Sequence, residues 1–260
     1  MDYHEILYEK SDGIAVLTLN RPEVLNAIGQ GMIREIVHVL DDVRHDETLC
    51  VLVVTGAGTA FSAGGNVKEI AQGKGLLEQG KEDITRTYRE GIQKIPLAFN
   101  SLEVPSIAAV NGVAIGAGCD LACMCDMRVA GEKARFSEIF AALGLISGDG
   151  GSYYLQRAVG YARACELTFT CEMIDARKAL EIGLVSEVTP PEMLMERVME
   201  LARQMADKPA RTLRMAKRLL LMSRAKPLDE VLDQAAVYQG ICHTMPEHRE
   251  ALERFFSRRK

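Results

Sequence analysis

Two glycine-rich loops, about fifty residues apart, have the residue types that could support catalysis by the main chain. They are Gly58–Lys68 and Asn111–Asp120, and each follows a short apolar segment typical of a buried strand. Small side chains let a ligand approach the backbone closely, and N–H groups at a strand-to-helix turn have no acceptor within the helix. Two such turns that meet would offer two donors to an oxygen that gains negative charge during a reaction. The pattern therefore predicts an oxyanion hole.

Other catalytic motifs fail on their spacing. Both loops lack the third glycine of a dinucleotide-binding fingerprint. A nucleophile elbow around Ser62 fails because Ala60 stands where a glycine is needed, and none of the five histidines lies in either loop. The cysteine-rich segment Cys119–Cys125 has no second set of metal ligands, so packed thiols are expected there and no metal site.

Composition predicts a globular protein of the cytoplasm. With 260 residues, 48% of them hydrophobic, the chain can bury a substantial core. The net charge of −5 gives no general attraction to nucleic acid or to an anionic membrane, so neither partner is expected. No apolar run approaches the roughly 18 residues of a membrane span, and the polar start Met1–Ile6 does not resemble a signal peptide. Seven scattered cysteines favour reduced, buried thiols.

The first half of the chain alternates strand-like and helix-like segments. The expected strands are Glu5–Lys10, Ile14–Asn20, Leu49–Thr55, Ser106–Val110 and Arg128–Ala130. The first two should form a hairpin around Asp12–Gly13. Met32–Val43 has the apolar spacing of a helix, and Ile84–Leu102 is expected to be a helix that is interrupted or kinked near Pro96. This order of elements predicts a mostly parallel sheet.

The second half is almost entirely helical in pattern from residue 190 onward. The expected helices are Glu192–Ala206, Pro209–Met222, Leu228–Cys242 and Pro246–Phe256. Proline marks most of their starts, as is typical of helix N-termini. A helical tail of this length, rich in methionine and leucine, needs a surface to cover. We therefore expect a core domain over residues 1–189 and a C-terminal helical region over residues 190–260.

Several segments together resemble the enoyl-CoA hydratase/isomerase family, also called the crotonase family. Besides the two loops, they are Ile14–Pro22, Leu25–Ala27, Asp126–Ala130 and Gly183–Val185. The resemblance implies an α/β crotonase fold, in which repeated ββα units form a spiral core and a C-terminal helical region helps oligomerisation and pocket closure. It also implies an acyl-CoA thioester substrate, no tightly bound cofactor, and a homotrimer or a dimer of trimers.

The resemblance assigns roles to both loops. It places the two oxyanion N–H groups on Ala63 and Ala117. It places contacts to coenzyme A on Leu25, Asn26, Ala27, Ala63, Gly64, Gly65, Asn66, Gly116 and Ala117. The thioester carbonyl oxygen would accept both oxyanion bonds, which makes the α-proton acidic and the β-carbon electrophilic. Hydration and double-bond isomerisation in the family both use the resulting enolate.

The acid–base positions depart from the pair of glutamates that hydratases of the family use. Asp120 stands at the first position, on the helix face of Ala117, although its carboxylate is one methylene shorter and could instead serve the helix dipole. Phe140 stands at the second position and cannot transfer a proton. Glu138 would point about 200° away in a helix, so we expect a structural or surface role for it.

Asp149 is the remaining acid–base candidate. Some family members with isomerase or dehalogenase activity have an aspartate in this loop, aligned one residue earlier, at Gly148. Asp149 could also cap the next helix. In an acyl pocket lined by Phe140 and Leu143, desolvation would raise its pKa and suit it to proton transfer. We therefore expect an acyl-CoA enzyme of the hydratase/isomerase type with Asp120 and Asp149 as acid–base residues; the alternatives are a single-carboxylate isomerase and a catalytically silent acyl-CoA-binding subunit.

Overall fold

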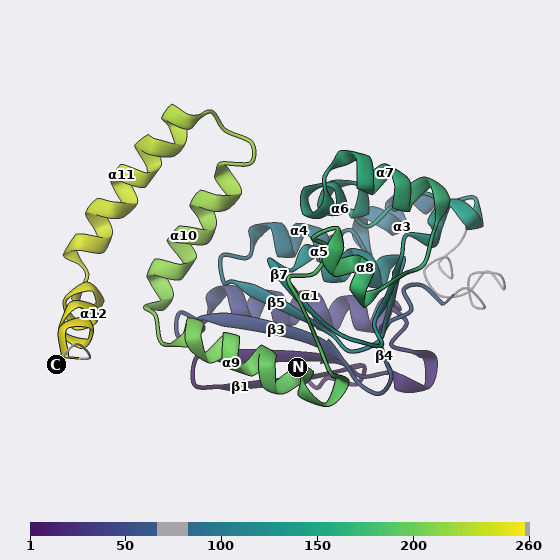
Figure 1. The fold of residues 1–260 in the computed structure, drawn as a ribbon, viewed down its shortest axis with the longest axis horizontal. Coiled ribbons are helices and arrows are strands. Elements are labelled where there is room, and N and C mark those ends of the chain that lie inside the picture. The colour runs from purple at the N-terminus through teal and green to yellow at the C-terminus, as the bar shows by residue number, and fades with distance from the viewer. Residues whose placement is uncertain (67–82, 258–260) are drawn as a thin grey trace.

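The computed structural model describes residues 1–66 and 83–257, whose strands form two sheets (Figure 1). The larger sheet has the order β1-β2-β3-β5-β7-β10, and the smaller has the order β4-β6-β8-β9. The strands are β1 (Ile6–Ser11), β2 (Ile14–Leu19), β3 (Val51–Gly56), β4 (Ala60–Ser62), β5 (Ser106–Val110), β6 (Val113–Ile115), β7 (Met127–Gly131), β8 (Arg135–Ser137), β9 (Ile174–Asp175) and β10 (Glu187–Thr189). Apart from β1–β2 and β8–β9, the strand pairs of the described residues are parallel, as predicted.

The helix predicted over Met32–Val43 is present, within a longer helix. The α-helices are α1 (Gln30–His45), α3 (Ile84–Glu90), α4 (Lys94–Ser101), α5 (Ala117–Met124), α6 (Gly151–Val159), α7 (Tyr161–Thr170), α8 (Ala176–Glu181), α9 (Leu194–Ala206), α10 (Ala210–Met222), α11 (Leu228–Thr244) and α12 (Pro246–Ser257). Short 3-10 helices are η1 (Pro22–Val24), η4 (Ile139–Leu143) and η5 (Pro191–Met193). The four predicted C-terminal helices begin and end within two residues of α9 to α12.

Consecutive strand pairs build the spiral core. In β3–β4, β5–β6 and β7–β8, the first strand joins the larger sheet and the second joins the smaller one. Helix α5 follows the second pair, and η4 with α6 follows the third. This repeated ββα arrangement is the one that the family resemblance implies. It brings the ends of β4, β6 and β8 to one edge, because these strands are neighbours in the smaller sheet.

The N-terminal hairpin also forms as predicted. Strands β1 and β2 pair antiparallel, with Ser11 opposite Ile14. The two residues between them, Asp12 and Gly13, have φ of 52° and 76°. Backbone of this left-handed kind matches the twist of paired strands, and aspartate and glycine adopt it more readily than most residues.

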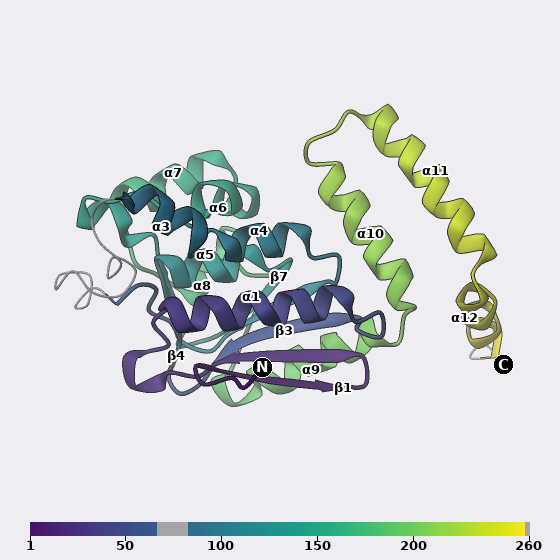
Figure 2. The same cartoon turned by 180° about the vertical axis from the view of Figure 1, so that it is seen from behind.

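Helices cover both faces of the larger sheet. Along β3, Leu52 and Val54 pack into the cluster that includes the apolar face of α1, whereas Val51 and Val53 pack against α9. Alternate residues of a strand point to opposite faces, so the continuous apolar run of this strand satisfies both layers. Figures 1 and 2 show α1 and α9 on the two sides of the sheet.

The interruption predicted near Pro96 in the helix over residues 84–102 lies earlier, at residues 91–93. The structure has two helices, α3 and α4, separated by residues 91–93. Pro96 lies in the first turn of α4, where its missing N–H would have had no acceptor within the helix. Gly91 therefore marks the break, and the proline helps to start the second helix.

Helices α10 and α11 extend away from the sheets (Figures 1 and 2). Because α9 packs on the larger sheet, the projecting part begins with α10, and the division into two regions at residue 190 stays a prediction. Large apolar side chains on this projecting part are exposed, among them Leu220, Leu228, Leu232, Val237 and Phe256. Across the described residues, no helix combines the length and apolar character needed to cross a membrane.

Candidate active site

The two glycine-rich loops meet at the edge of the smaller sheet. A Cβ atom on Gly64 would lie 2.4 Å from the carbonyl oxygen of Ile115 and 3.0 Å from the amide nitrogen of Ala117. A Cβ on Gly118 would lie 2.2 Å from the carbonyl oxygen of Ser62. These distances leave no room for a side chain, so only glycine permits this approach. The convergence expected from the sequence is therefore present.

The N–H of Ala117 is open in the second loop. Ala117 is the first residue of α5, where an amide has no acceptor within the helix. Two nearby backbone N–H groups are already hydrogen-bonded. The N–H of Gly116 donates to the carbonyl of Ser137 at 2.8 Å, and the N–H of Asp120 donates to the carbonyl of Gly116 at 2.9 Å. For Ala117 itself, the described residues provide no acceptor. This N–H group is therefore free to donate to a ligand, as an oxyanion hole would require.

Ala63 was expected to supply the other oxyanion N–H. A hydrogen bond of the Ala63 N–H within the chain contradicts this expectation. The N–H of Ala63 donates to the carbonyl of Leu25 at 2.9 Å, while Ile28 donates to the carbonyl of Gly64 at 2.8 Å. This pairing uses the Ala63 amide to fix the loop, so it is not available to a substrate. Gly65, two residues further along, has no acceptor for its N–H among the described residues. Sequence spacing alone did not distinguish these two amides.

The segment predicted to contact coenzyme A mainly holds the first loop in place. Asn26 is fully buried, and its Nδ2 donates to the carbonyls of Ala57 and Ala60, both at 2.9 Å. Its Oδ1 accepts the N–H of Arg21 at 2.9 Å. Leu25 is 44% exposed, whereas the Ala27 side chain is buried. Of these three predicted contacts, only the side chain of Leu25 is open to a ligand.

The two predicted acid–base residues, Asp120 and Asp149, come together through one hydroxyl group. Ser147 Oγ lies 2.8 Å from Asp120 Oδ2 and 3.1 Å from Asp149 Oδ1. The same oxygen accepts the N–H of Gly151 at 2.7 Å, at the start of α6. Both carboxylates are buried. Ser147 was not predicted as a site residue, because serine in a glycine-rich turn is typical of turns in general.

The capping alternative for Asp149 is wrong. The residue that precedes α6 is Gly150, and no side chain caps the helix from that position. The first N–H of α6 is satisfied by Ser147. Asp149 is thus free of the helix backbone, and its carboxylate is directed toward Ser147 and Asp120.

Glu138 was expected to turn away from the site, and the structure places it inside. The residue directly follows β8 and precedes η4, so the α-helical offset used in the prediction does not apply. Strand β8 pairs with β6, with Ser137 opposite Ile115, which brings Glu138 beside the start of α5. Its side chain is 3% exposed. The missed signal was a strand, which is hard to recognise from a few residues.

Two of the three carboxyl groups, Asp120 and Glu138, have raised pKa values. Burial, followed by the charges of Asp149 and Glu138, raises the pKa of Asp120 well above its usual range. Burial also raises the pKa of Glu138 to about 7, although hydrogen bonds with Asp120 and Cys119 act to lower it. No lysine, arginine or histidine of the described residues forms an ion pair with any of the three. The described part of the chain holds no group of three side chains arranged for a metal ion.

Phe140 closes one side of the second loop. A Cβ atom on Gly116 would lie 3.4 Å from Phe140 Cζ, so the ring stands directly against the residue before Ala117. An aromatic ring cannot transfer a proton, so this position carries no acid or base. Leu143, expected in the acyl pocket, is exposed on η4.

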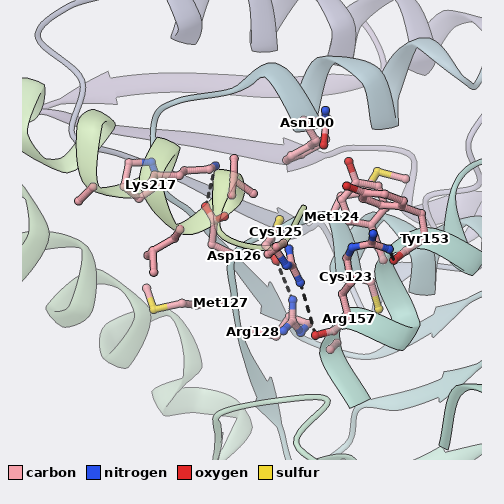
Figure 3. A pocket seen from close by; sticks show the side chains of 18 of the residues that line it. Asn100, Cys123, Met124, Cys125, Asp126, Met127, Arg128, Tyr153, Arg157 and Lys217 are labelled. Atoms are coloured by element: carbon pink, nitrogen blue, oxygen red, sulfur yellow. Dashed lines mark hydrogen bonds and ion pairs between the residues drawn. The ribbon is translucent and has the colours of Figure 1, made fainter. Parts of the chain in front are cut away.

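A separate cavity of about 690 Å³ lies at the other end of α5 (Figure 3). Its walls come from residues 123–128, from α6 and from α10. Within it, Lys217 Nζ lies 2.7 Å from Asp126 Oδ2, and Arg128 donates to the carbonyl of Cys125 at 2.7 Å. Neither Ala117 nor the three carboxylates line this cavity. It arises where α10 leaves the core and is distinct from the candidate active site.

Comparison with known proteins agrees with this architecture. The sequence model of the enoyl-CoA hydratase/isomerase family matches residues 9–260. The chain is 32% identical to a short-chain-enoyl-CoA hydratase of Clostridium acetobutylicum, over all of this chain and 97% of that protein. It is 32% identical to a 2,3-dehydroadipyl-CoA hydratase of Escherichia coli, over 98% of this chain and 96% of that protein. The crystal structure of an enoyl-CoA hydratase from Bacillus anthracis superposes with a TM-score of 0.90 at 29% identity, covering 98% of this chain and 97% of that one.

The chain therefore belongs to the enoyl-CoA hydratase/isomerase family and has the crotonase fold. This family membership supports an enzyme that acts on acyl-CoA thioesters.

Proposed function

We propose that this protein hydrates the double bond of a 2-enoyl-CoA thioester and holds the enolate oxygen between the amides of Gly65 and Ala117. The observation that carries the proposal is the pair of buried carboxyl groups, Asp120 and Asp149, joined through Ser147 next to the start of α5. The dipole of α5 adds positive potential at Ala117, where negative charge develops. The names of the relatives, several of them enoyl-CoA hydratases, support the same reaction.

Two proton transfers complete the proposed reaction. Asp149, as a carboxylate, takes a proton from water while the water oxygen bonds to the β-carbon, and the electrons of the double bond move onto the thioester oxygen. Protonated Asp120 then gives its proton to the α-carbon as the enolate returns to the thioester. A positioned acid or base contributes about 10²- to 10⁴-fold to such a reaction.

A double-bond isomerase is the second candidate, and Phe140 favours it. An isomerase moves one proton between two carbons, so a single carboxylate suffices, and the ring that replaces the family's second glutamate would keep water out. In either case coenzyme A enters as part of the substrate. We also propose a homotrimer or a dimer of trimers in the cytoplasm, supported by the exposed apolar side chains of α10 to α12.

An acyl-CoA panel read by mass spectrometry tests the function. Hydration adds the mass of water, and isomerisation shifts the double bond without a change in mass. Asp120→Asn and Asp149→Asn are each expected to lower kcat about a hundredfold or more, with KM little changed. Glu172→Gln, an exposed acid, is the control. Tight binding of acyl-CoA without turnover or α-carbon deuterium exchange would instead identify a silent binding subunit.

A further inference from the structure

Two buried carboxylate oxygens in the active site have no hydrogen-bond donor. They are Asp120 Oδ1 and Glu138 Oε1, and among the described residues neither finds a partner. An unsatisfied buried polar atom costs about 1 to 3 kcal/mol, so such atoms are rare unless something satisfies them. Two carboxyl groups can satisfy each other only when one of them holds a proton. The two orphaned oxygens therefore indicate a shared proton.

The surroundings of the pair favour this proton. The titratable groups that face the two acids are Asp149, Cys119 and Cys123, and Tyr88 faces Asp149 from α3. None of these groups is a cation, and no ion pair of the described residues reaches the cluster. Two ionised carboxylates in such a site would repel each other at low effective dielectric constant. One negative charge for the pair is the state that the site tolerates.

We propose that Glu138 is a positioning residue that shares a proton with Asp120 and thereby keeps Asp120 in the acid form that protonates the substrate. The inference rests on the proposed function and adds to it the partner of the acid. Glu138 acts through Asp120 and not on the substrate. Its role therefore differs from that of the family's second glutamate, whose position is occupied by Phe140 in this chain. Glu138 at the end of β8 lies beside the start of α5, and its side chain is within hydrogen-bond reach of Asp120.

The proton balance of a hydration cycle closes within the cluster. In the first step Asp149 takes a proton from water as the oxygen–carbon bond forms. In the second step the O–H bond of Asp120 breaks and a C–H bond forms at the α-carbon, so the Asp120–Glu138 pair is left without its proton. Asp149 then gives its proton to Ser147 Oγ, whose own proton passes to Asp120. Ser147 lies within hydrogen-bond distance of both aspartates, and the resting state is restored.

The Glu138→Gln variant tests the proposal because it keeps the shape of the side chain and removes its charge. Without a like charge beside it, Asp120 loses its proton at a lower pH. The alkaline limb of the kcat–pH profile is expected to move to lower pH by about one unit or more, with about a tenfold loss of kcat above the limb. KM should stay within about twofold, because Glu138 does not contact the substrate. Glu132→Gln, an exposed glutamate before the same strand, is the matched control.

An infrared titration separates failure of this inference from failure of the proposed function. The C=O stretch of a protonated buried carboxyl group is visible without substrate, and its midpoint should fall in Glu138→Gln and stay unchanged in Glu132→Gln. If the Gln variant does not fold, Glu138→Asp should give a smaller shift in the same direction. A uniform loss of kcat with an unmoved pH limb and an unmoved infrared midpoint would overturn the proposal and leave Glu138 a structural residue.

Discussion

The carboxylate cluster and the C-terminal helices depart from ordinary packing in opposite ways. Around Asp120, acidic groups are buried without counter-charges among the described residues. On α10 to α12, large apolar groups such as Leu232 and Val237 are exposed. A buried charge costs stability inside one chain, and folds keep such groups mainly where they serve chemistry. An exposed apolar face costs little in the monomer but favours association, which is why these helices support the proposed oligomer.

The two regions are also joined to the rest of the fold differently. The cluster is held at the end of β8, in the first turn of α5 and just before α6. Helix α10 instead makes polar anchors: Lys217 Nζ lies 2.9 Å from the carbonyl of Val104 besides its ion pair with Asp126, and Arg214 donates to the carbonyls of Arg44 and Asp46 at the C-terminal end of α1. Cations at that helix end complement its dipole. The core therefore orients the tail through a few specific bonds.

The largest effect is expected where the two loops touch. In Gly64→Ala the new Cβ would meet the carbonyl of Ile115 at 2.4 Å, at φ of +76°, and push apart the proposed donors Gly65 and Ala117. Loss of one oxyanion donor typically lowers kcat about 10²- to 10³-fold. Gly183→Ala is a matched control, because Gly183 has φ of +75° with no atom within 4 Å of a new Cβ. Equal loss of activity in both variants would show that backbone strain, and not the loop contact, is responsible.

The buried acids should make stability depend on pH. Because the folded-state pKa of Glu138 is raised to about 7 from 4.5, the stability it contributes is complete below pH 4.5 and is lost as the pH rises through 7. Glu138→Gln has no such loss, so it should be more stable than the wild type by about 3 kcal/mol at pH 8 and equally stable near pH 4. Denaturant unfolding at both pH values measures this. An equal difference in stability between the variant and the wild type at both pH values would mean that packing, and not ionisation, causes the effect.

Removal of the anchor of α10 should have a smaller effect. Lys217→Met leaves Asp126 without its buried cation, although Ser106 still donates to it from N and Oγ. A loss of about 2 kcal/mol in unfolding free energy is expected. The exposed ion pair of Lys226 with Glu230 provides the control, since Lys226→Met should cost less than about 0.5 kcal/mol. Thermal unfolding of both variants at the same protein concentration measures the two losses of stability. Equal losses in the two variants would contradict the role of burial.

The smallest effect on the folding of the chain itself is expected at an exposed leucine of the tail. Leu232→Ser should change the monomer's unfolding free energy by less than about 0.5 kcal/mol, since the side chain is 57% exposed. If a second copy covers this face, the same change should shift the assembly toward smaller species in sedimentation velocity. Leu97→Ser, at an exposed leucine on α4, should leave the assembly as it is. An unchanged assembly in both variants would remove α11 from the proposed interface.

The regular elements of the fold were predictable because their signals are local. The strands β1, β2, β3, β5 and β7 and the C-terminal helices follow from apolar spacing that a short window contains, and the hairpin at Asp12–Gly13 follows from its turn residues. The interruption between α3 and α4 was misplaced because a proline tolerated in a first turn looks the same in sequence as one that breaks a helix.

The glycine loops, Asp120, Asp149 and the absence of an acid at position 140 could all be recognised from the order of the residues. Two features required the tertiary structure. The N–H of Ala63 donates to the carbonyl of Leu25, which lies 38 positions earlier in the sequence. Glu138 lies with the other two acids because β8 pairs with β6. Sequence determines which groups are available along the chain. Hydrogen-bond partners and burial depend on segments far apart in sequence, so only the folded chain decided which amides remain open and which carboxyl groups must hold a proton.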